Sequence, residues 1–473
     1  MSDTRDTRFH QIYVGGLLFS LGLALVGICF GDPSTILTGL NTIFTTQDVL
    51  ISDYIAIGGM AAAFVNASLV TLISMVILWF SKDPLNGYTI VEIGLMSGFS
   101  FFGKNITNIW PIIIGTFLYA KVRREPFSKY ASVSLLATAL APATSFLSLA
   151  DGWGNPLVGI TVGLVIGFVI PPLSAYTYKI QNGMNLYNMG FACGLLALIL
   201  VPLMNSMGNS PTPVLFWSKG NNTTLGIILA LMCLLFILIG FFGTKHPAWS
   251  VWAGYRKLLT TTGRAPSDYL RMFGAGPVLV NMGVNGLIAT AYILLIGGDL
   301  NGPTLGGIFA VIGFSAFGKH VLNIAPVMIG VIIGGTVMHW SLDDPSVQLA
   351  GLFCTTLAPI SGYFGWPFGI LAGFLHSSVV LMTGGFIGGV NLYNNGFSGG
   401  LIAIVLYPII TAIAKGRNPS IQDEDYFDAF AYSAPISPDE GRRHKEDVDP
   451  TAPIPPTKPP KPDNPAPAQY HKR

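Results

Sequence analysis

Two lysines stand inside long apolar stretches, where a charged side chain is unusual. Lys104 follows the run GFSFFG and Lys319 follows GFSAFG, and each precedes an asparagine by four residues, at Asn108 and Asn323. A charged group in a membrane interior is costly and commonly marks a solute or ion pathway. If the apolar segments beside each lysine re-enter the membrane, the two ammonium groups would converge on an anion. The alternative is that each lysine ends a turn between two spans and extends to the membrane interface.

A repeated NLYN motif opens the last long apolar stretch of each half of the chain. Asparagine both donates and accepts hydrogen bonds, tyrosine carries a hydroxyl, and helix N-terminal amides favour anions. These groups suit a carboxylate or an amide. An asparagine here could equally be a helix N-cap, and the tyrosine part of an interfacial belt, although one cap does not need two asparagines. The motif residues are Asn185, Tyr187, Asn188, Asn391, Tyr393 and Asn394.

Two further apolar stretches contain a proline followed by a hydroxyl residue. Pro142 precedes Thr144, and Pro359 precedes Ser361. A proline frees a backbone carbonyl, which a nearby hydroxyl can compensate or which a solute can use. A structural kink is the simpler interpretation of both prolines.

Three ionisable residues occur in only one half of the chain. Glu92 lies within an apolar stretch and is a candidate proton or cation site, or a partner for Lys104. His320 and His376 are candidate proton carriers. For each histidine, a hydrogen-bonded structural role is the alternative.

The composition defines the class of protein that holds these residues. Of 473 residues, 51% are apolar and only 10% are charged, against about a quarter in an average soluble domain. Long runs almost free of charge, separated by short loops, predict an all-α integral membrane protein. This composition excludes a disordered main body, a nucleic-acid partner and a secreted disulfide scaffold. The expected partners are the lipid bilayer and a small-molecule solute, and the sequence leaves open whether the chain forms a homo-oligomer.

Motifs for catalysis are missing from the sequence. The four cysteines lie in apolar stretches without the spacing of a metal site. There is no nucleotide-binding loop, serine-hydrolase elbow or zinc-protease motif. We therefore expect a protein that is not an enzyme and has no metal or cofactor.

Two blocks of sequence occur twice. Residues 85–115 align with 300–330 at 16 of 31 positions, and residues 185–202 align with 391–408 at 11 of 18. The chain is therefore a tandem duplication with about seven apolar segments in each half, which predicts 10–14 transmembrane helices. The third and fourth segments of each half are short and glycine-rich, so they could be two thin spans or one re-entrant hairpin. The predicted parts are a membrane repeat at 11–207, a linker at 208–221 and a second membrane repeat at 222–415.

The basic residues change sides between equivalent loops. The loop at 32–53 has no lysine or arginine, whereas its counterpart at 244–271 has five. The loop at 121–129 has four, whereas its counterpart at 339–346 has none. Because cytoplasmic loops are enriched in lysine and arginine, this pattern predicts two repeats of inverted topology. It also places both termini in the cytoplasm, with a bacterial inner membrane as the expected location.

The two ends of the chain differ from the body. Residues 1–10 are polar and are predicted to be a short cytoplasmic tail. Residues 416–473 hold 12 of the 32 prolines mixed with charged residues. Such a segment buries too little apolar surface to offset its ordering entropy, which predicts a disordered cytoplasmic tail.

Through its LNG…GFS-x-FGK…NI-x-P and NLYN-x-GF motifs, the chain resembles a duplicated bacterial membrane-protein family classed as a domain of unknown function. The similarity covers most of 11–415 and implies a membrane location without a mechanism. The plan of two inverted halves also looks like that of urea transporters, at the level of the fold. We expect a secondary transporter of a small anionic or zwitterionic solute that binds where the repeats meet. The alternatives are a passive channel for a small polar solute and a membrane scaffold.

Overall fold

The computed structural model describes residues 2–49, 51–81, 85–150 and 154–413, and these ranges are helical. They contain nineteen α-helices and no β-strand, apart from the isolated bridges Ser52–Phe216 and Asp268–Phe317. The all-α fold class predicted from the sequence is confirmed. The predicted tail at 416–473 lies outside the described residues.

Within the described ranges, ten helical segments are long and apolar enough to cross a membrane. The protein is therefore a multi-pass membrane protein, and ten candidate spans lie within the predicted range of 10–14. Five come from each half of the chain: α1 (Ser2–Phe30), α3 (Tyr54–Ser81), α6–α7 (Ala131–Leu149), α8 (Pro156–Ile180), α9 (Asn188–Ser206), α10 (Asn222–Phe242), α13 (Ala275–Leu295), α16–α17 (Pro345–Phe364), α18 (Trp366–Phe386) and α19 (Asn394–Ile413).

The helices beside the two lysines are shorter than these spans. They are α4 (Gly87–Phe99), α5 (Trp110–Arg123), α14 (Gly302–Phe314) and α15 (Val321–Val337). At 1.5 Å per residue, the 13 residues of α4 or α14 cover about 20 Å, which is less than the roughly 30 Å of a bilayer core. A turn separates the two helices of each pair, and they diverge from it: α4 packs on α14, whereas α5 packs on α8 and α15 packs on α18.

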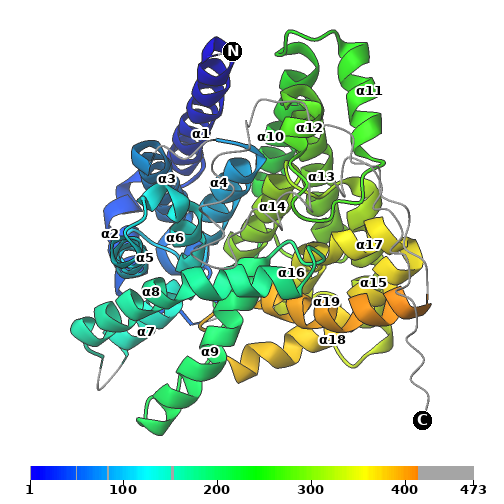
Figure 1. Ribbon diagram of the computed structural model, residues 1–473. Helices are drawn as coiled ribbons and strands as arrows, with labels where there is room; N and C mark the ends of the chain where they lie inside the picture. The colour runs from blue at the N-terminus through cyan, green and yellow to red at the C-terminus, as the bar shows by residue number, and fades with distance from the viewer. Residues whose placement is uncertain (1, 50, 82–84, 151–153, 414–473) are drawn as a thin grey trace, which may run out of the picture. The chain divides into compact units, whose positions relative to one another are not determined.

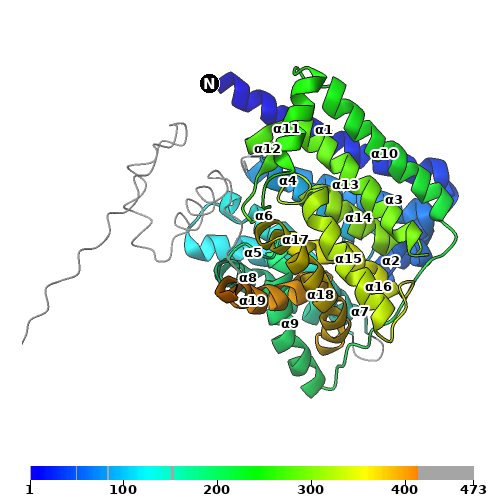
Figure 2. The ribbon, with the colours of Figure 1, turned by 90° about the vertical axis from the view of Figure 1, so that its right-hand side faces the viewer.

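The two halves contain equivalent helix contacts. The pair α1 and α3 corresponds to α10 and α13, and the pair α5 and α8 corresponds to α15 and α18. Figure 2 shows α10, α13 and α14 side by side. Two helix pairs, α4 with α14 and α9 with α19, join the halves to each other, and α4 is visible beside α14 in Figure 1.

Glycines allow α4 and α14 to approach at backbone distance. A Cβ atom on Gly94 would lie 2.7 Å from the carbonyl oxygen of Phe309, and one on Gly98 would lie 2.9 Å from that of Gly306. Small residues at such contacts are typical of helix packing in membranes. The glycine-rich composition of these segments thus has a structural cause.

The predicted kinks at the prolines are present. The α6–α7 span is interrupted by the 3-10 turn Thr138–Leu140, and the α16–α17 span by Cys354–Leu357. Pro142 and Pro359 are each the second residue of the helix that follows.

Smaller elements were not expected from the sequence. The helices α2 (Ile36–Thr45), α11 (Ala248–Leu258) and α12 (Tyr269–Phe273) lie in segments predicted as loops. Conversely, the helix α1 begins at Ser2, within the predicted N-terminal tail.

Candidate functional site

Six segments that are not α-helical come together between the two halves. They are the turns after α4 and α14, the two 3-10 turns, and the stretches that lead into α9 and α19. Leu186 donates its backbone N–H to Thr356 O at 3.0 Å, and Leu392 donates to Ala139 O at 3.0 Å. Irregular backbone at membrane depth is tolerated where protein buries it or where it lines a cavity. This junction is therefore the place to look for a site.

Each lysine meets a tyrosine from the other half of the chain at this junction. Lys104 Nζ donates to Tyr393 Oη at 2.7 Å, and Lys319 Nζ donates to Tyr187 Oη at 2.5 Å. Both lysines are 0% exposed. Each ammonium also lies over the ring of its tyrosine, 4.8 Å from the centroid of Tyr393 and 4.4 Å from that of Tyr187, which adds a cation–π attraction.

The remaining contacts of the lysines are not carboxylates. Lys319 Nζ donates to Thr355 Oγ1 at 2.7 Å, and Lys104 Nζ lies 3.4 Å from Met96 Sδ. Glu92 is buried on α4, but the structure does not pair it with Lys104. Lysines elsewhere in the described ranges do have carboxylate partners, such as Lys129 with Glu125 at 3.0 Å.

A cavity of about 20 Å³ is lined by both of these tyrosines, while Lys104 and Lys319 are not among its lining residues. This volume holds roughly one water molecule. Its wall is mainly aromatic and aliphatic, and both tyrosines contribute to it. The lining includes Tyr88, Leu95, Phe99, Leu136, Leu186, Tyr187, Phe314, Phe353, Leu392, Tyr393 and Asn395.

The first asparagine of each NLYN motif holds the tyrosine in position. Asn185 Nδ2 donates to Gly396 O at 3.0 Å, and Asn391 Nδ2 donates to Gly190 O at 3.1 Å, so each connects α9 with α19. Their Oδ1 atoms accept the backbone N–H groups of Tyr187 and Tyr393. These amides therefore position the tyrosines by joining the two halves of the chain.

The second asparagine of each motif faces a neighbouring helix. Asn188 Nδ2 donates to Ser174 O on α8 at 3.0 Å, and Asn394 Nδ2 donates to Val380 O on α18 at 3.2 Å. The Oδ1 atoms of Asn188 and Asn394 are buried and accept no hydrogen bond within the described part of the chain.

The asparagines after the lysines close the turns that carry the lysines. Asn108 Nδ2 donates to Gly103 O at 3.0 Å, and Asn323 Nδ2 donates to Gly318 O at 2.9 Å. Gly103 has φ 108° and Gly318 has φ 95°, a conformation that glycine adopts without strain. The Gly-Lys pair is thus explained by the turn, and the asparagines support it.

The other candidates lie around this junction and do not contact the lysines. Thr144 Oγ1 donates to Asn108 O at 3.0 Å, while the Ser361 hydroxyl has no hydrogen-bond partner among the described residues. His320 Nε2 is 2.9 Å from Thr261 O. His376 Nε2 is 3.0 Å from Oδ1 of Asn395, which lines the cavity.

Two aspartates that sequence reasoning did not select connect the halves. Asp53 Oδ1 accepts the N–H of Gly302 at the start of α14 (3.1 Å), and Asp268 Oδ1 accepts the N–H of Gly87 at the start of α4 (3.2 Å). A carboxylate is favourable at a helix N-terminus. Burial raises the pKa of both carboxyl groups, and the backbone hydrogen bonds oppose that shift. The repeated triplet Ser-Asp-Tyr at 52–54 and 267–269 was the signal for this role.

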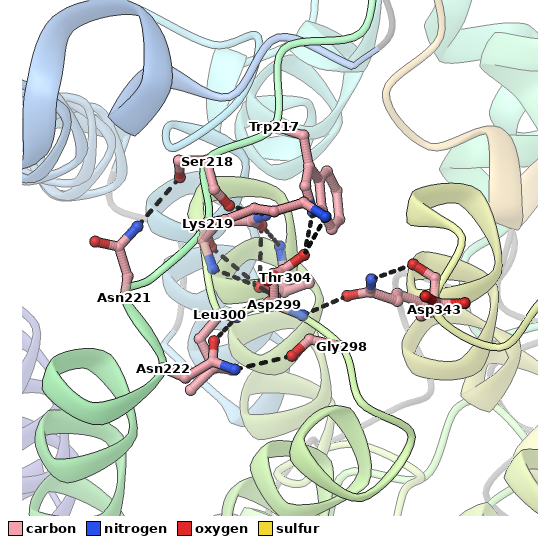
Figure 3. Close-up of polar contacts among 12 residues, drawn as sticks. Trp217, Ser218, Lys219, Asn221, Asn222, Gly298, Asp299, Leu300, Thr304 and Asp343 are labelled. Atoms are coloured by element: carbon pink, nitrogen blue, oxygen red, sulfur yellow. Dashed lines mark hydrogen bonds and ion pairs between the residues drawn. The ribbon is translucent and has the colours of Figure 1, made fainter.

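The segment between the repeats covers the start of α14. Asp53 Oδ2 accepts the N–H of Ser218 at 2.8 Å, and Trp217 Nε1 donates to Asp299 Oδ2 at 2.9 Å. Figure 3 shows Trp217, Lys219 and Thr304 gathered around Asp299. This polar network fixes one end of α14.

The fold and this junction define a multi-pass helical membrane protein built from two equivalent halves. The family "Protein of unknown function (DUF1576)" matches the chain twice, at residues 32–206 and 248–412, and the protein belongs to this family. The double match confirms both the duplication and the family resemblance seen in the sequence. No curated protein and no solved structure gave a significant match.

Proposed function

We propose that the protein is a secondary transporter of a small anionic or zwitterionic solute, bound where its two repeats meet. One observation carries the proposal: two fully buried lysines, each paired with a tyrosine hydroxyl of the other repeat and, among the described residues, with no carboxylate. Burying an ammonium group without an opposite charge is strongly unfavourable. An anion between the two pairs would offset that cost for both lysines.

The proposal includes inverted topology of the repeats, with both termini in the cytoplasm. Five candidate spans per repeat is an odd number, and the short pair α4–α5 or α14–α15 adds two crossings or none. The parity therefore stays odd, and the second repeat would begin on the opposite side of the membrane. The reversed distribution of lysine and arginine in equivalent loops supports the same arrangement.

The size of the cavity favours a second candidate, a passive channel for a small polar solute. A cavity of about 20 Å³ suits molecules that pass singly. A channel would show flux that does not saturate and does not depend on a proton gradient, whereas a transporter would saturate.

The test compares ligand binding by the purified protein with that of a Lys104→Met/Lys319→Met variant. A ligand that binds only the folded state raises the melting temperature. We expect formate, acetate, glycine or chloride to raise it in the wild type and not in the variant, and urea to have no effect. Lys129→Met, which changes an exposed lysine, is the control and should respond like the wild type. A response to urea alone, unchanged in the double variant, would replace the transporter by the channel.

A further inference from the structure

Resting on the proposed function, we propose that the central cavity selects small monovalent anions of the size of formate, and that Phe353 sets the size limit. This assigns a narrower ligand class than the proposed function and gives Phe353 a role in specificity.

Phe353 marks one place where the two halves contribute side chains of different size to the cavity wall. The lining contains the equivalent pairs Phe99 and Phe314, Leu186 and Leu392, and Tyr187 and Tyr393. The Leu-Ala-Pro triplets at 140–142 and 357–359 align the two discontinuous spans at an offset of 217. At that offset Phe353 is equivalent to Leu136, and both residues line the cavity. One repeat therefore contributes a large ring where the other contributes a smaller side chain.

The ring of Phe353 lies between the two lysine–tyrosine pairs. Its centroid is 5.4 Å from that of Phe99, in a stacked arrangement, and 6.2 Å from that of Tyr187. Phe99 in turn lies 4.4 Å from Tyr393. The rings thus form a continuous aromatic series from one pair to the other, with Phe353 in its middle. A solute that touches both pairs has to share this space with Phe353.

The chemistry of the wall restricts the solute further. Beyond the two tyrosines, Tyr88 and Asn395, the lining residues are apolar or glycine, and the Asn395 Oδ1 atom already contacts His376. The ammonium group of a zwitterion would be left without a carboxylate, at the full cost of an unsatisfied buried charge. A monovalent anion at the two tyrosine hydroxyls, to which Lys104 and Lys319 donate, meets no such penalty. The lining therefore favours an anion with few heavy atoms over an amino acid.

The experiment measures uptake of radiolabelled formate, acetate and propionate into vesicles that contain the purified full-length protein. Wild type should take up formate at least about tenfold faster than propionate, since one methylene commonly changes discrimination by about 10–200-fold. Phe353→Leu, which copies the residue of the other repeat, should reduce this ratio by about tenfold. Leu136→Phe should lower uptake of all three acids, because it fills the remaining space. Phe309→Leu, the same change at a buried phenylalanine outside the cavity lining, should leave the ratio unchanged.

The outcomes separate this inference from the proposed function. If formate uptake depends on Lys104 and Lys319 but folded Phe353→Leu keeps the wild-type ratio, the size limit is wrong and the transporter remains. If wild type takes up none of the acids but glycine or chloride still raises its melting temperature through the lysines, the assignment to small carboxylates is wrong and the transporter remains. If uptake ignores both lysines, the proposed function itself is wrong. Leu136→Phe is a second, independent test of the cavity. If this variant folds and takes up all three acids at the wild-type rate, the solute does not pass through this cavity.

Discussion

At the scale of single residues, the pairing of each lysine with a tyrosine of the other repeat is the central feature. The hydroxyl of Tyr187 or Tyr393 accepts a hydrogen bond from the ammonium group, and the ring face supplies a further attraction. Neither contact neutralises the charge. The pairs therefore hold the lysines in place without occupying their capacity to bind an anion.

The aspartates that connect the halves lead to a prediction about stability. Asp53 Oδ1 accepts from Ile55 and Gly302, and Oδ2 accepts the N–H and hydroxyl of Ser218. In Asp53→Asn an NH₂ group would face one of these donor pairs, leaving buried groups unsatisfied. We expect a loss of about 1–3 kcal/mol in the free energy of unfolding, measured by denaturant titration in detergent. The exposed Asp343→Asn should change it by less than about 0.5 kcal/mol, and an equal effect of both variants would contradict a connecting role for Asp53.

Residue type alone identified part of this site. Lys104, Lys319 and the NLYN motifs were selected because charged and amide groups are rare in apolar segments. The exchange of partners between repeats was not predictable, since sequence spacing says nothing about which helices cross. The role of Asp53 and Asp268 is not predictable, because an aspartate at the edge of an apolar segment is common and its hydrogen-bond partner lies more than 180 residues away.

At the scale of elements, hydropathy predicts the long helices well because each must be apolar over its whole length. The segment expected at 54–81 is α3 without any shift, although Gly59 interrupts it with φ 82°. The short helices α2 and α11 were not predicted, since their segments are too short to span a membrane. The contact of α4 with α14 was also not predictable, because several glycine-rich stretches compete for the same partner.

The close contact between α4 and α14 can be tested by substituting Gly94, which lies at the contact, and Gly22, which does not. In Gly94→Ala the new methyl group would lie 2.7 Å from a backbone oxygen of α14, which cannot move away without shifting the helix. We expect a loss of about 1–3 kcal/mol in the free energy of unfolding. Gly22→Ala on α1 has no atom within 4 Å of the added methyl, so it should be neutral or stabilise by up to about 1 kcal/mol. Equal behaviour of the two variants in denaturant titration would show that the helices do not touch here.

At the scale of the whole molecule, three kinds of hydrogen bond join the two halves of the chain. Lysines bind tyrosines, asparagines bind helix carbonyls and aspartates bind helix N-termini, each time from one half to the other. A rearrangement of one half therefore has to move groups held by the other, and the proposed transporter would use such a movement to expose its site alternately.

The proposed inverted topology gives a prediction for labelling in intact cells. Arg123, the last residue of α5, and His339, two residues after the end of α15, lie at equivalent helix ends. In a background without the four native cysteines, an impermeant maleimide should label His339→Cys, which we place outside, and not Arg123→Cys. Permeabilised cells should show labelling of both, as the control. Labelling of both in intact cells would mean that the repeats have the same orientation.

The crossed bonds at the starts of α4 and α14 have a consequence for the history of the chain. The start of α4 in the first repeat is bound by Asp268 of the second repeat, and the start of α14 in the second repeat is bound by Asp53 of the first. Under the inverted arrangement, a polypeptide of one repeat's length, inserted in both orientations, could form all of these bonds between two identical copies. Gene fusion would then fix the orientation of each copy. Once fixed, the copies no longer had to match, and Glu92 opposite Gly307 and Leu136 opposite Phe353 are positions where they have diverged.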